Sequence, residues 1–370
     1  MLREISLTVD YEIFGNGTGD VRQHVTEPTE RMAEQCEKYG APLTVFLEVE
    51  EYLAFERHRA QLDADLGYDP AKVIREQLLS LVRRGHDLQL HLHPQWHESR
   101  YVDGQWHLRP QIQTVDDLFK TQEEVDAYIR DRKAVIDEIY AAAGAVKSVV
   151  VYRAGAFSAQ PGSKLLKALE RNGITVDSSV VHGLVKRNET LNLDYRNAPA
   201  GRRHWKVTKD VGEEDSSGAV TEVPIYSVMG RRLFQVTFRR MRAKFSRNVP
   251  KSQQKALVKQ LGVRKNPFSF LKFLFQPVPI KLDFDNLSPA KLVRWIRSAP
   301  APRRGELDVL VLIGHTKEHL DHSAFEEFLA RAAREPEIRI VSMTHIAESL
   351  RNVGGTQKEQ ESARDVAGAR

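Results

Sequence analysis

The sequence predicts an α/β protein built on a parallel sheet or on a β/α barrel. Short apolar runs that are typical of buried strands alternate with amphipathic helical patterns, which favours strand–helix–strand units. The clearest apolar run is LDVLVLI at residues 307–313. Strands that are apolar on both faces indicate a parallel sheet whose two faces are covered. In such folds the active site lies at the carboxyl ends of the strands.

The expected strands are short, apolar and rich in β-branched residues or leucine. Polar or turn-forming residues bound each of them, as is usual between strands and helices. They lie at residues 5–9, 43–47, 88–92, 148–152, 174–176, 307–313 and 338–341.

The expected helices carry start or stop signals. Pro28 stands near the start of the first helix and Gly40 just past its end, which are the positions that these residues favour. Asp69 is placed to cap the second helix, and Thr121 with Glu124 forms a capping box for a long third one. The predicted helices lie between residues 26 and 40, between 69 and 85, after 121, at 165–171 and at 325–333.

The composition is ordinary for a soluble globular protein, with 41% hydrophobic and 28% charged residues and a formal net charge of +5. The single cysteine, Cys36, allows no internal disulfide and suits a reducing compartment. The first residues lack the apolar run of a signal peptide, and no segment approaches the ~18 apolar residues of a transmembrane helix. We therefore expect a cytoplasmic protein, with a peripheral position at the inner membrane face as an option.

Ionisable residues stand at the carboxyl ends of four predicted strands. All of them are of types that act in catalysis or bind metals, and four such strand ends in one chain are hard to attribute to chance. They are, in chain order, Asp10 and Glu12, His91 and His93, Arg153, and His315.

The spacing of these residues indicates a metal site. Side chains alternate along a strand, so residues i and i+2 point to the same side. His91 and His93 can therefore converge on one ion, and so can Asp10 and Glu12. Two imidazoles and a carboxylate, with one position left for water, form a common catalytic zinc arrangement. The alternative is that the two histidines simply begin a polar loop.

Three neighbours of the histidine pair are less certain ligands. His86 precedes the strand, at the end opposite the expected site, so we interpret it as structural. Gln95 and His97 lie beyond Pro94 in the following loop. Either side chain could turn back toward the ion, and the spacing alone does not decide between them and His93.

In order and position, the strand-end motifs resemble those of the polysaccharide deacetylases, the NodB-homology or carbohydrate esterase 4 group. The resemblance covers roughly residues 3–183 and 305–350. It implies a distorted (β/α)7 barrel that removes acetyl groups from N-acetylated sugars with a divalent metal, usually zinc. The motifs are Asp10-x-Glu12, Gly85-His86-x-Leu88-x-x-His91, Arg153-x-Gly155-x-Phe157, Asp177-Ser178-Ser179 and Leu312-x-Gly314-His315.

The resemblance implies three catalytic roles. Asp10 matches the base that takes a proton from water, Arg153 matches the arginine that orients this base, and His315 matches the acid that protonates the departing amine. A positioned acid or base typically contributes about 10²–10⁴-fold to the rate.

The metal ligands depart from the family pattern at two positions. The family's metal-binding aspartate directly follows the base, where this chain has Tyr11, so Glu12 would be the metal carboxylate. His91 matches the first metal histidine, but the position of the second is Gln95. Either His93 replaces it, or metal binding is lost or altered. Four further residues are predicted to line the substrate groove: Tyr11, Trp96, Phe157 and Asp177.

The region between the two barrel-like parts is predicted to be an insertion. Residues 1–183 and 305–350 form the barrel, residues 184–304 the insertion and residues 351–370 a disordered tail. From residue 231 to 281 the insertion has no acidic residue and many basic and aromatic ones. It could be a solvated basic helix, rest on an anionic membrane surface or bind a phosphorylated sugar donor. No nucleic-acid motif accompanies it, so nucleic acid is not expected.

These observations leave three functions. The first is a metal-dependent deacetylase acting on an N-acetylated sugar or glycan precursor, with zinc as the expected cofactor. The second is another β/α-barrel metallohydrolase, such as an amidohydrolase or phosphoesterase. The third is an inactive deacetylase-like protein that binds glycan or membrane, which Tyr11 and Gln95 favour.

Overall fold

The main sheet of this computed structural model has nine strands, and the structure describes residues 2–187, 191–235, 274–319 and 321–352. The strands run in the order β10-β11-β7-β6-β3-β2-β1-β14, and β15 pairs with the start of β1. Neighbouring strands are parallel except for β10 and β11. The strands are β1 (Arg3–Tyr11), β2 (Thr44–Glu48), β3 (Asp87–Leu92), β6 (Val151–Ala154), β7 (Val176–Asp177), β10 (Trp205–Val207), β11 (Val220–Glu222), β14 (Val309–His315) and β15 (Ile338–Ile340).

The sheet curls, and a short segment after β11 joins its two sides. Ile225 forms parallel bridges both to Val181, which lies beyond β7, and to Val311 in β14. The N–H of Ile225 donates to the carbonyl of Val180, and the N–H of Tyr226 donates to the carbonyl of Val311, each at 2.9 Å. These bonds close a distorted barrel, so the predicted α/β barrel class is confirmed.

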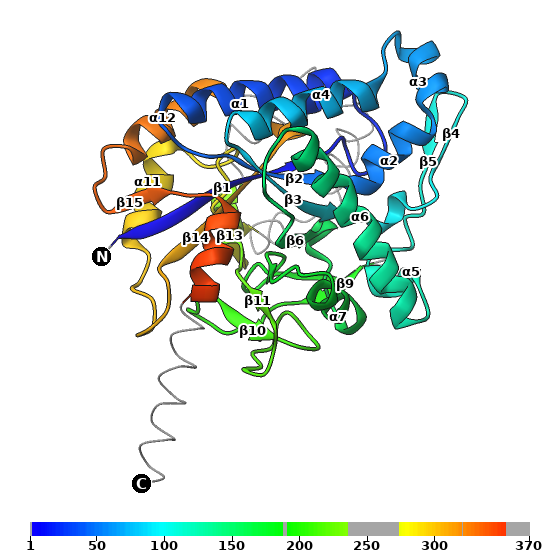
Figure 1. Cartoon of the computed structure of the whole chain (residues 1–370). Coiled ribbons are helices and arrows are strands. Elements are labelled where there is room, and N and C mark those ends of the chain that lie inside the picture. The colour runs from blue at the N-terminus through cyan, green and yellow to red at the C-terminus, as the bar shows by residue number, and fades with distance from the viewer. Residues whose placement is uncertain (1, 188–190, 236–273, 320, 353–370) are drawn as a thin grey trace.

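Helices cover the outer face of the curled sheet (Figure 1). Neighbouring helices follow the order α11, α12, α1, α4, α6 and α7, and α2 contacts both α4 and α6. Helices α1 and α4 are joined by a hydrogen bond from Gln77 to Glu30. This order follows the strands from β14 to β7, as right-handed β/α units require. The helices are α1 (Glu27–Lys38), α2 (Val49–Arg57), α3 (Arg59–Leu66), α4 (Pro70–Arg83), α5 (Val115–Leu118), α6 (Gln122–Ala142), α7 (Ser163–Arg171), α11 (Pro289–Ser298) and α12 (His322–Ala332).

Two predicted helix starts are present with their caps. Asp69 accepts a hydrogen bond from the N–H of Lys72 at the start of α4. Thr121 and Glu124 form the reciprocal capping box of α6. Each cap satisfies N–H groups that have no partner inside the helix.

The fourth strand begins three residues later than the sequence predicts. Side chains take the N–H groups that would otherwise extend its ladder. The N–H of Val149 donates to Asp137 at 2.9 Å, and the N–H groups of Val150 and Val151 donate to Oε1 of Gln89 at 3.1 and 2.8 Å. The strand β6 begins at Val151 and includes Arg153, which the sequence analysis placed just after the strand.

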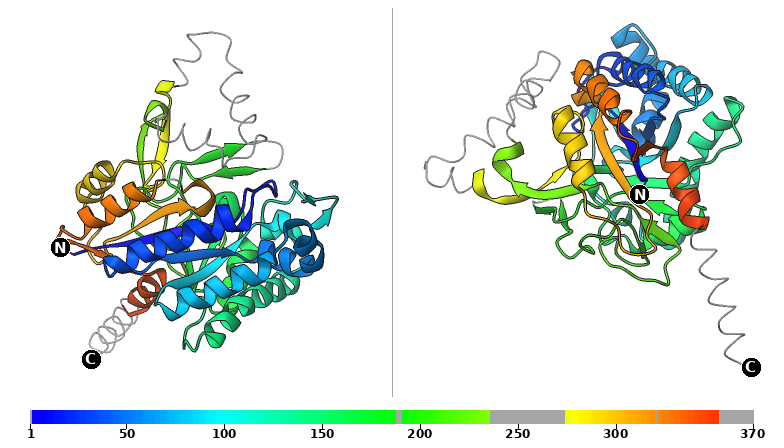
Figure 2. Two further views of the ribbon diagram at one scale, coloured as in Figure 1. Left: turned by 90° about the horizontal axis from the view of Figure 1, so that it is seen from above. Right: turned by 90° about the vertical axis from the view of Figure 1, so that its left-hand side faces the viewer.

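Residues 184–304, the predicted insertion, contribute β10 and β11 to the main sheet and also form two hairpins. One hairpin pairs β8 (Val185–Arg187) with β9 (Asn192–Asp194), and the other pairs β12 (Ser227–Arg231) with β13 (Pro277–Lys281). The second extends away from the barrel (Figure 2). A third hairpin, β4 (Arg100–Val102) with β5 (Gln105–His107), follows β3.

Much of the basic stretch at residues 231–281 lies outside the described residues, as do residues 353–370 of the predicted tail. The membrane surface considered as a partner for that stretch therefore stays a prediction. Among the helices that the structure describes, none is long and apolar enough to cross a membrane.

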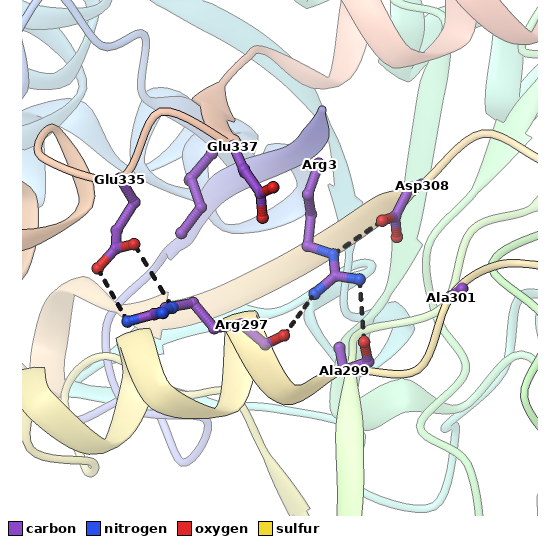
Figure 3. Close-up of a pocket in the computed structure, with 8 residues that line it drawn as sticks. Arg3, Arg297, Ala299, Ala301, Asp308, Glu335 and Glu337 are labelled. Atoms are coloured by element: carbon purple, nitrogen blue, oxygen red, sulfur yellow. Dashed lines mark hydrogen bonds and ion pairs between the residues drawn. The ribbon is translucent and has the colours of Figure 1, made fainter. Parts of the chain in front are cut away.

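Ion pairs line a cavity of about 270 Å³ near the amino-terminal ends of β1 and β14, away from the strand ends that carry the predicted site. Arg3 donates to Asp308 and to the carbonyl of Ala299, both at 2.9 Å, and Arg297 lies 3.5 Å from Glu335 (Figure 3). Arg3 and Arg297 are thus both paired within the protein, so we interpret this cavity as structural.

Candidate active site

The carboxyl ends of β1, β3, β6 and β14 bring the predicted residues together. The strand register sets Asp10 of β1 beside His315 of β14, and His91 of β3 beside Arg153 of β6. The residues directly after β1 and β3 complete the cluster: Glu12 and His93.

Glu12, His91 and His93 form a candidate metal site. Nε2 of His93 lies 2.9 Å from Oε2 of Glu12, and Nε2 of His91 lies 3.9 Å from the same oxygen. The two imidazole rings are nearly perpendicular, with centroids 5.0 Å apart. The three donor atoms lie within 4.8 Å of one another, so they could share one ion. Asp10, Glu12 and His315 form a second group of this kind around the same glutamate.

His91 has the chemistry of a metal ligand. Its Nδ1 lies 2.9 Å from the carbonyl oxygen of Arg153, which requires a proton on Nδ1 and leaves the lone pair on Nε2. Nε2 is buried and has no hydrogen-bond partner among the described residues. Burial lowers the pKa of His91 to about 4, so the imidazole is neutral at physiological pH. A buried, neutral nitrogen without a partner fits a divalent ion.

The backbone around His93 is shaped to admit its ring. A side chain at Gly155 would place its Cβ 2.5 Å from ring atoms of His93, so only glycine fits there. The N–H of His93 donates to Oε1 of Glu48 at 2.9 Å. Glu48 also caps α2 by accepting from the N–H groups of Glu50 and Glu51. These contacts fix the turn that aims His93 at Glu12.

Lys317 compensates the charge of Glu12. Its Nζ lies 2.6 Å from Oε1 of Glu12 and donates to the carbonyl of Ile13 at 3.1 Å. Burial would raise the pKa of Glu12, but Lys317 and His93 together hold it well below its ordinary value. Glu12 therefore stays ionised, with Oε1 bound to the lysine and Oε2 facing the histidines.

Asp10 is held as a carboxylate by Arg153. The guanidinium is fully buried and donates from Nη1 to Oδ1 of Asp10 at 2.7 Å. It also donates to Thr8 Oγ1 at 3.0 Å and to the carbonyl of Ser178 at 3.1 Å, and it stacks on the ring of Phe46. Burial would raise the pKa of Asp10, but Arg153, followed by the nearby histidines, lowers it. Asp10 thus remains a proton acceptor inside the protein.

His315 faces Asp10 from the adjacent strand. Its Nε2 lies 3.6 Å from Oδ2 of Asp10, the oxygen that Arg153 does not bind. Oδ2 of Asp285 accepts from the backbone N–H of His315 at 2.8 Å and so positions the end of β14. The pair thus brings a carboxylate and an imidazole into near contact.

Gln95, His97 and His86 lie away from this cluster. Gln95 donates to the carbonyl of Gly15 at 2.8 Å, and His97 lies 3.5 Å from Glu50. His86 is almost fully buried, and its Nδ1 accepts from the backbone N–H of Leu43. The structure therefore places His93, rather than Gln95 or His97, with His91 and Glu12.

Three of the four predicted groove residues do not reach the site. Tyr11 is 1% exposed and donates to Gln77 at 2.9 Å, and Trp96 is 0% exposed among other aromatic rings. Asp177 is fully buried on β7, beside Glu222 of β11. Tyr11 and Asp177 point into packed protein from their strands, and Trp96 lies in the turn after β3, where it packs against Phe55 and Trp106. Phe157, in contrast, lines a pocket that His315 also lines.

Three residues of the site escaped the sequence analysis: Lys317, Glu48 and Asp285. Lys317 lies in the 3-10 turn Thr316–Glu318 after β14, so strand alternation does not place its side chain. Glu48 ends an apolar run and precedes a helix, which is the usual position of a cap. Asp285 lies in a loop, and no sequence pattern links it to His315.

The chain is similar to several solved structures. A candidate polysaccharide deacetylase from Mycobacterium smegmatis shares 15% identity, with 94% of this chain and 90% of that chain covered and a TM-score of 0.45. A family 4 carbohydrate esterase from Streptomyces lividans shares 10% identity, with 91% and 90% covered and a TM-score of 0.35. A 4-alpha-glucanotransferase from Thermococcus litoralis shares 13% identity, with 93% and 40% covered and a TM-score of 0.46. No protein-family model and no curated protein matches the sequence.

These structures include the deacetylase group that the motifs resemble, together with an enzyme of a different activity. One fold hosts many chemistries, and the site decides among them. The identities and TM-scores are low, so the function proposed below rests on the geometry of the residues themselves.

Proposed function

We propose that the protein is a metal-dependent hydrolase that removes an acetyl group from an N-acetylated sugar or glycan precursor. The observation that carries the proposal is the buried Nε2 of His91, which has no partner among the described residues and lies near the ionised carboxylate of Glu12. A carboxylate–imidazole pair, Asp10 and His315, stands beside it. A ligand set next to a base and an acid is what amide hydrolysis requires.

A divalent ion held by Glu12, His91 and His93 would polarise the acetyl carbonyl and lower the pKa of water to about 7. Zinc is the expected ion, because two imidazoles and a carboxylate with an open position suit it.

The chain's own residues would move the protons. Asp10 is ionised and accepts the proton of the attacking water through Oδ2, since Oδ1 is occupied by Arg153. His315, whose Nε2 faces Oδ2 of Asp10, donates a proton to the nitrogen of the departing amine. Arg153 keeps Asp10 oriented and charged throughout.

Acetate release tests the proposal. The full chain is freed of metal with a chelator and incubated with an N-acetylated chitooligosaccharide, with and without added Zn²⁺. We expect acetate only when a divalent ion is present. Full release in excess chelator would show that the reaction does not use this site as proposed.

Asp10→Asn separates the base from the ligands. The variant keeps the shape of the side chain but does not accept a proton, so turnover should fall about 10²–10⁴-fold. Bound metal, measured by elemental analysis, should stay at the wild-type level. Loss of metal together with activity, in a variant that keeps the wild-type circular dichroism spectrum, would instead make Asp10 a ligand.

A further inference from the structure

A pocket of about 340 Å³ opens beside His315, a size within the range of small-molecule sites. Segments outside the catalytic cluster form much of its wall. Phe157 comes from the turn after β6, Lys186 from β8 and Lys281 from the end of β13. The pocket is therefore continuous with the candidate active site but is built largely by the region between the two barrel parts.

Two ammonium groups lie at the aromatic ring in this pocket. Nζ of Lys186 is 4.9 Å and Nζ of Lys281 is 4.5 Å from the centroid of Phe157. Lys186 also donates to the carbonyl of Ala156 at 3.0 Å, which anchors its side chain. Each ammonium group lies within cation–π range of the ring, and together they make this part of the pocket wall positively charged.

Lys281 also disfavours the charged form of Lys186. Burial, followed by the nearby charge of Lys281, lowers the pKa of Lys186 to about 8. Holding two like charges in a partly buried pocket costs free energy, and an anion bound between them would remove that cost.

Two acidic residues also line the pocket. Asp283 lines it, but Oδ1 of Asp283 accepts from the backbone N–H groups of Asp285 and Asn286, and Oδ2 accepts from the Asn286 side chain. Burial, followed by the charge of Asp285, raises the pKa of Asp283, and the nearby charge of Lys281 opposes this shift. Glu318 is the other acidic lining residue.

We propose that this pocket binds a phosphate or carboxylate carried by the sugar substrate, with Lys186 and Lys281 as its cationic partners. The proposal rests on the deacetylase function proposed above and narrows its substrate class to anionic N-acetylated sugars. Lysine binds phosphate as a compact point charge, and either oxyanion would place oxygen atoms between two such charges. The neighbouring acetamido group would then lie toward Asp10 and His315.

Binding of three sugars to the full chain tests this inference independently of turnover. N-acetylglucosamine is neutral, its 1-phosphate carries a phosphate, and N-acetylmuramic acid carries a carboxylate. Calorimetry in chelator prevents the oxyanion from binding a metal ion, and a parallel series with Zn²⁺ covers the metal-bound protein. At least one anionic sugar should bind roughly tenfold or more tightly than the neutral one, as expected for hydrogen bonds to a charged group.

Variants locate the effect. Lys186→Met and Lys281→Met should each lower the preference for the anionic sugar about tenfold, while Lys186→Arg keeps the charge and most of the preference. Lys72→Met is the matched control, because Lys72 is 68% exposed on α4 and absent from the pocket wall. It should leave binding unchanged.

Equal binding of neutral and anionic sugars would overturn the inference, and so would a preference that survives in both methionine variants. The protein could prefer anionic sugars through both lysines and yet release no acetate with any metal. That result would support the anion site and reject the deacetylase function. The two proposals therefore fail separately.

Discussion

Arg153 is fully buried, and each nitrogen of its guanidinium donates to a neighbour on β1 or after β7. A buried charge of this kind is stable only while its partners remain, since each partner would otherwise be left without a bond in a low-dielectric interior. Arg153 thus both holds Asp10 in the candidate site and contributes to the stability of the barrel.

Arg153→Met should lower the free energy of unfolding by about 3–5 kcal/mol, because Asp10 loses its cation and stays buried. Urea denaturation followed by circular dichroism measures the loss. Arg171→Met is the control, since Arg171 pairs with Asp126 on the exposed side of α7 and its loss should barely move the midpoint. Equal losses in both variants would show that the buried pair has no special weight.

The sequence predicted most residues of the candidate site but did not decide its third candidate metal ligand. The strand alternation of His91 and His93 and the spacing of Asp10 and Glu12 carried the prediction, because these patterns depend only on local geometry. Whether His93, Gln95 or His97 completes the ligand set depended on the turn after β3. That turn is set by Glu48 and Gly155, which are distant in sequence.

At the scale of elements, β7 and β11 carry two carboxyl groups side by side. Asp177 and Glu222 are paired across the strands and are both fully buried. Burial raises the pKa of Asp177 to about 7, and burial together with Asp177 raises the pKa of Glu222 well above its ordinary value. Burial therefore favours the protonated form of both carboxyl groups.

This pair predicts a fall in stability as the pH rises. Below the ordinary pKa of 3.8, Asp177 is protonated in both the folded and the unfolded chain. Between that value and about 7, the folded protein holds a proton that the unfolded chain has released, so the free energy of unfolding decreases with pH.

Asp177→Asn tests the sign of this effect. The variant has no proton to lose at this position, so its stability should decline less than that of the wild type between acidic and neutral pH. Urea midpoints in a pH series compare the two proteins. Parallel declines would mean that Asp177 does not contribute.

The elements themselves were predictable where local signals were strong. Apolar runs located β1, β2, β3 and β14, Pro28 and Gly40 located α1, and caps located α4 and α6. The predicted start of β6 was wrong because the side chains of Asp137 and Gln89 accept hydrogen bonds from the backbone N–H groups there. Helices α2 and α3 and the hairpins after β3 had no strong periodic signal.

At the scale of the whole molecule, the site depends on closure of the barrel by residues far apart in sequence. The pairing of β1 with β14 brings Asp10 to His315, and Ile225 links β14 back to the segment after β7. Sequence periodicity predicts strands but not such single bridges. The order of the strands along the sheet could be expected only from the general rules for parallel strands and from the resemblance of the motifs.

The most direct test of the account is the metal content of four variants of the full chain. The proteins are saturated with Zn²⁺, freed of excess ion and measured by elemental analysis. We predict that His91→Ala and His93→Ala lose the ion, whereas Gln95→Ala and His97→Ala keep it at the wild-type level. Retention of zinc by His93→Ala, or its loss from Gln95→Ala or His97→Ala, would contradict the proposed site.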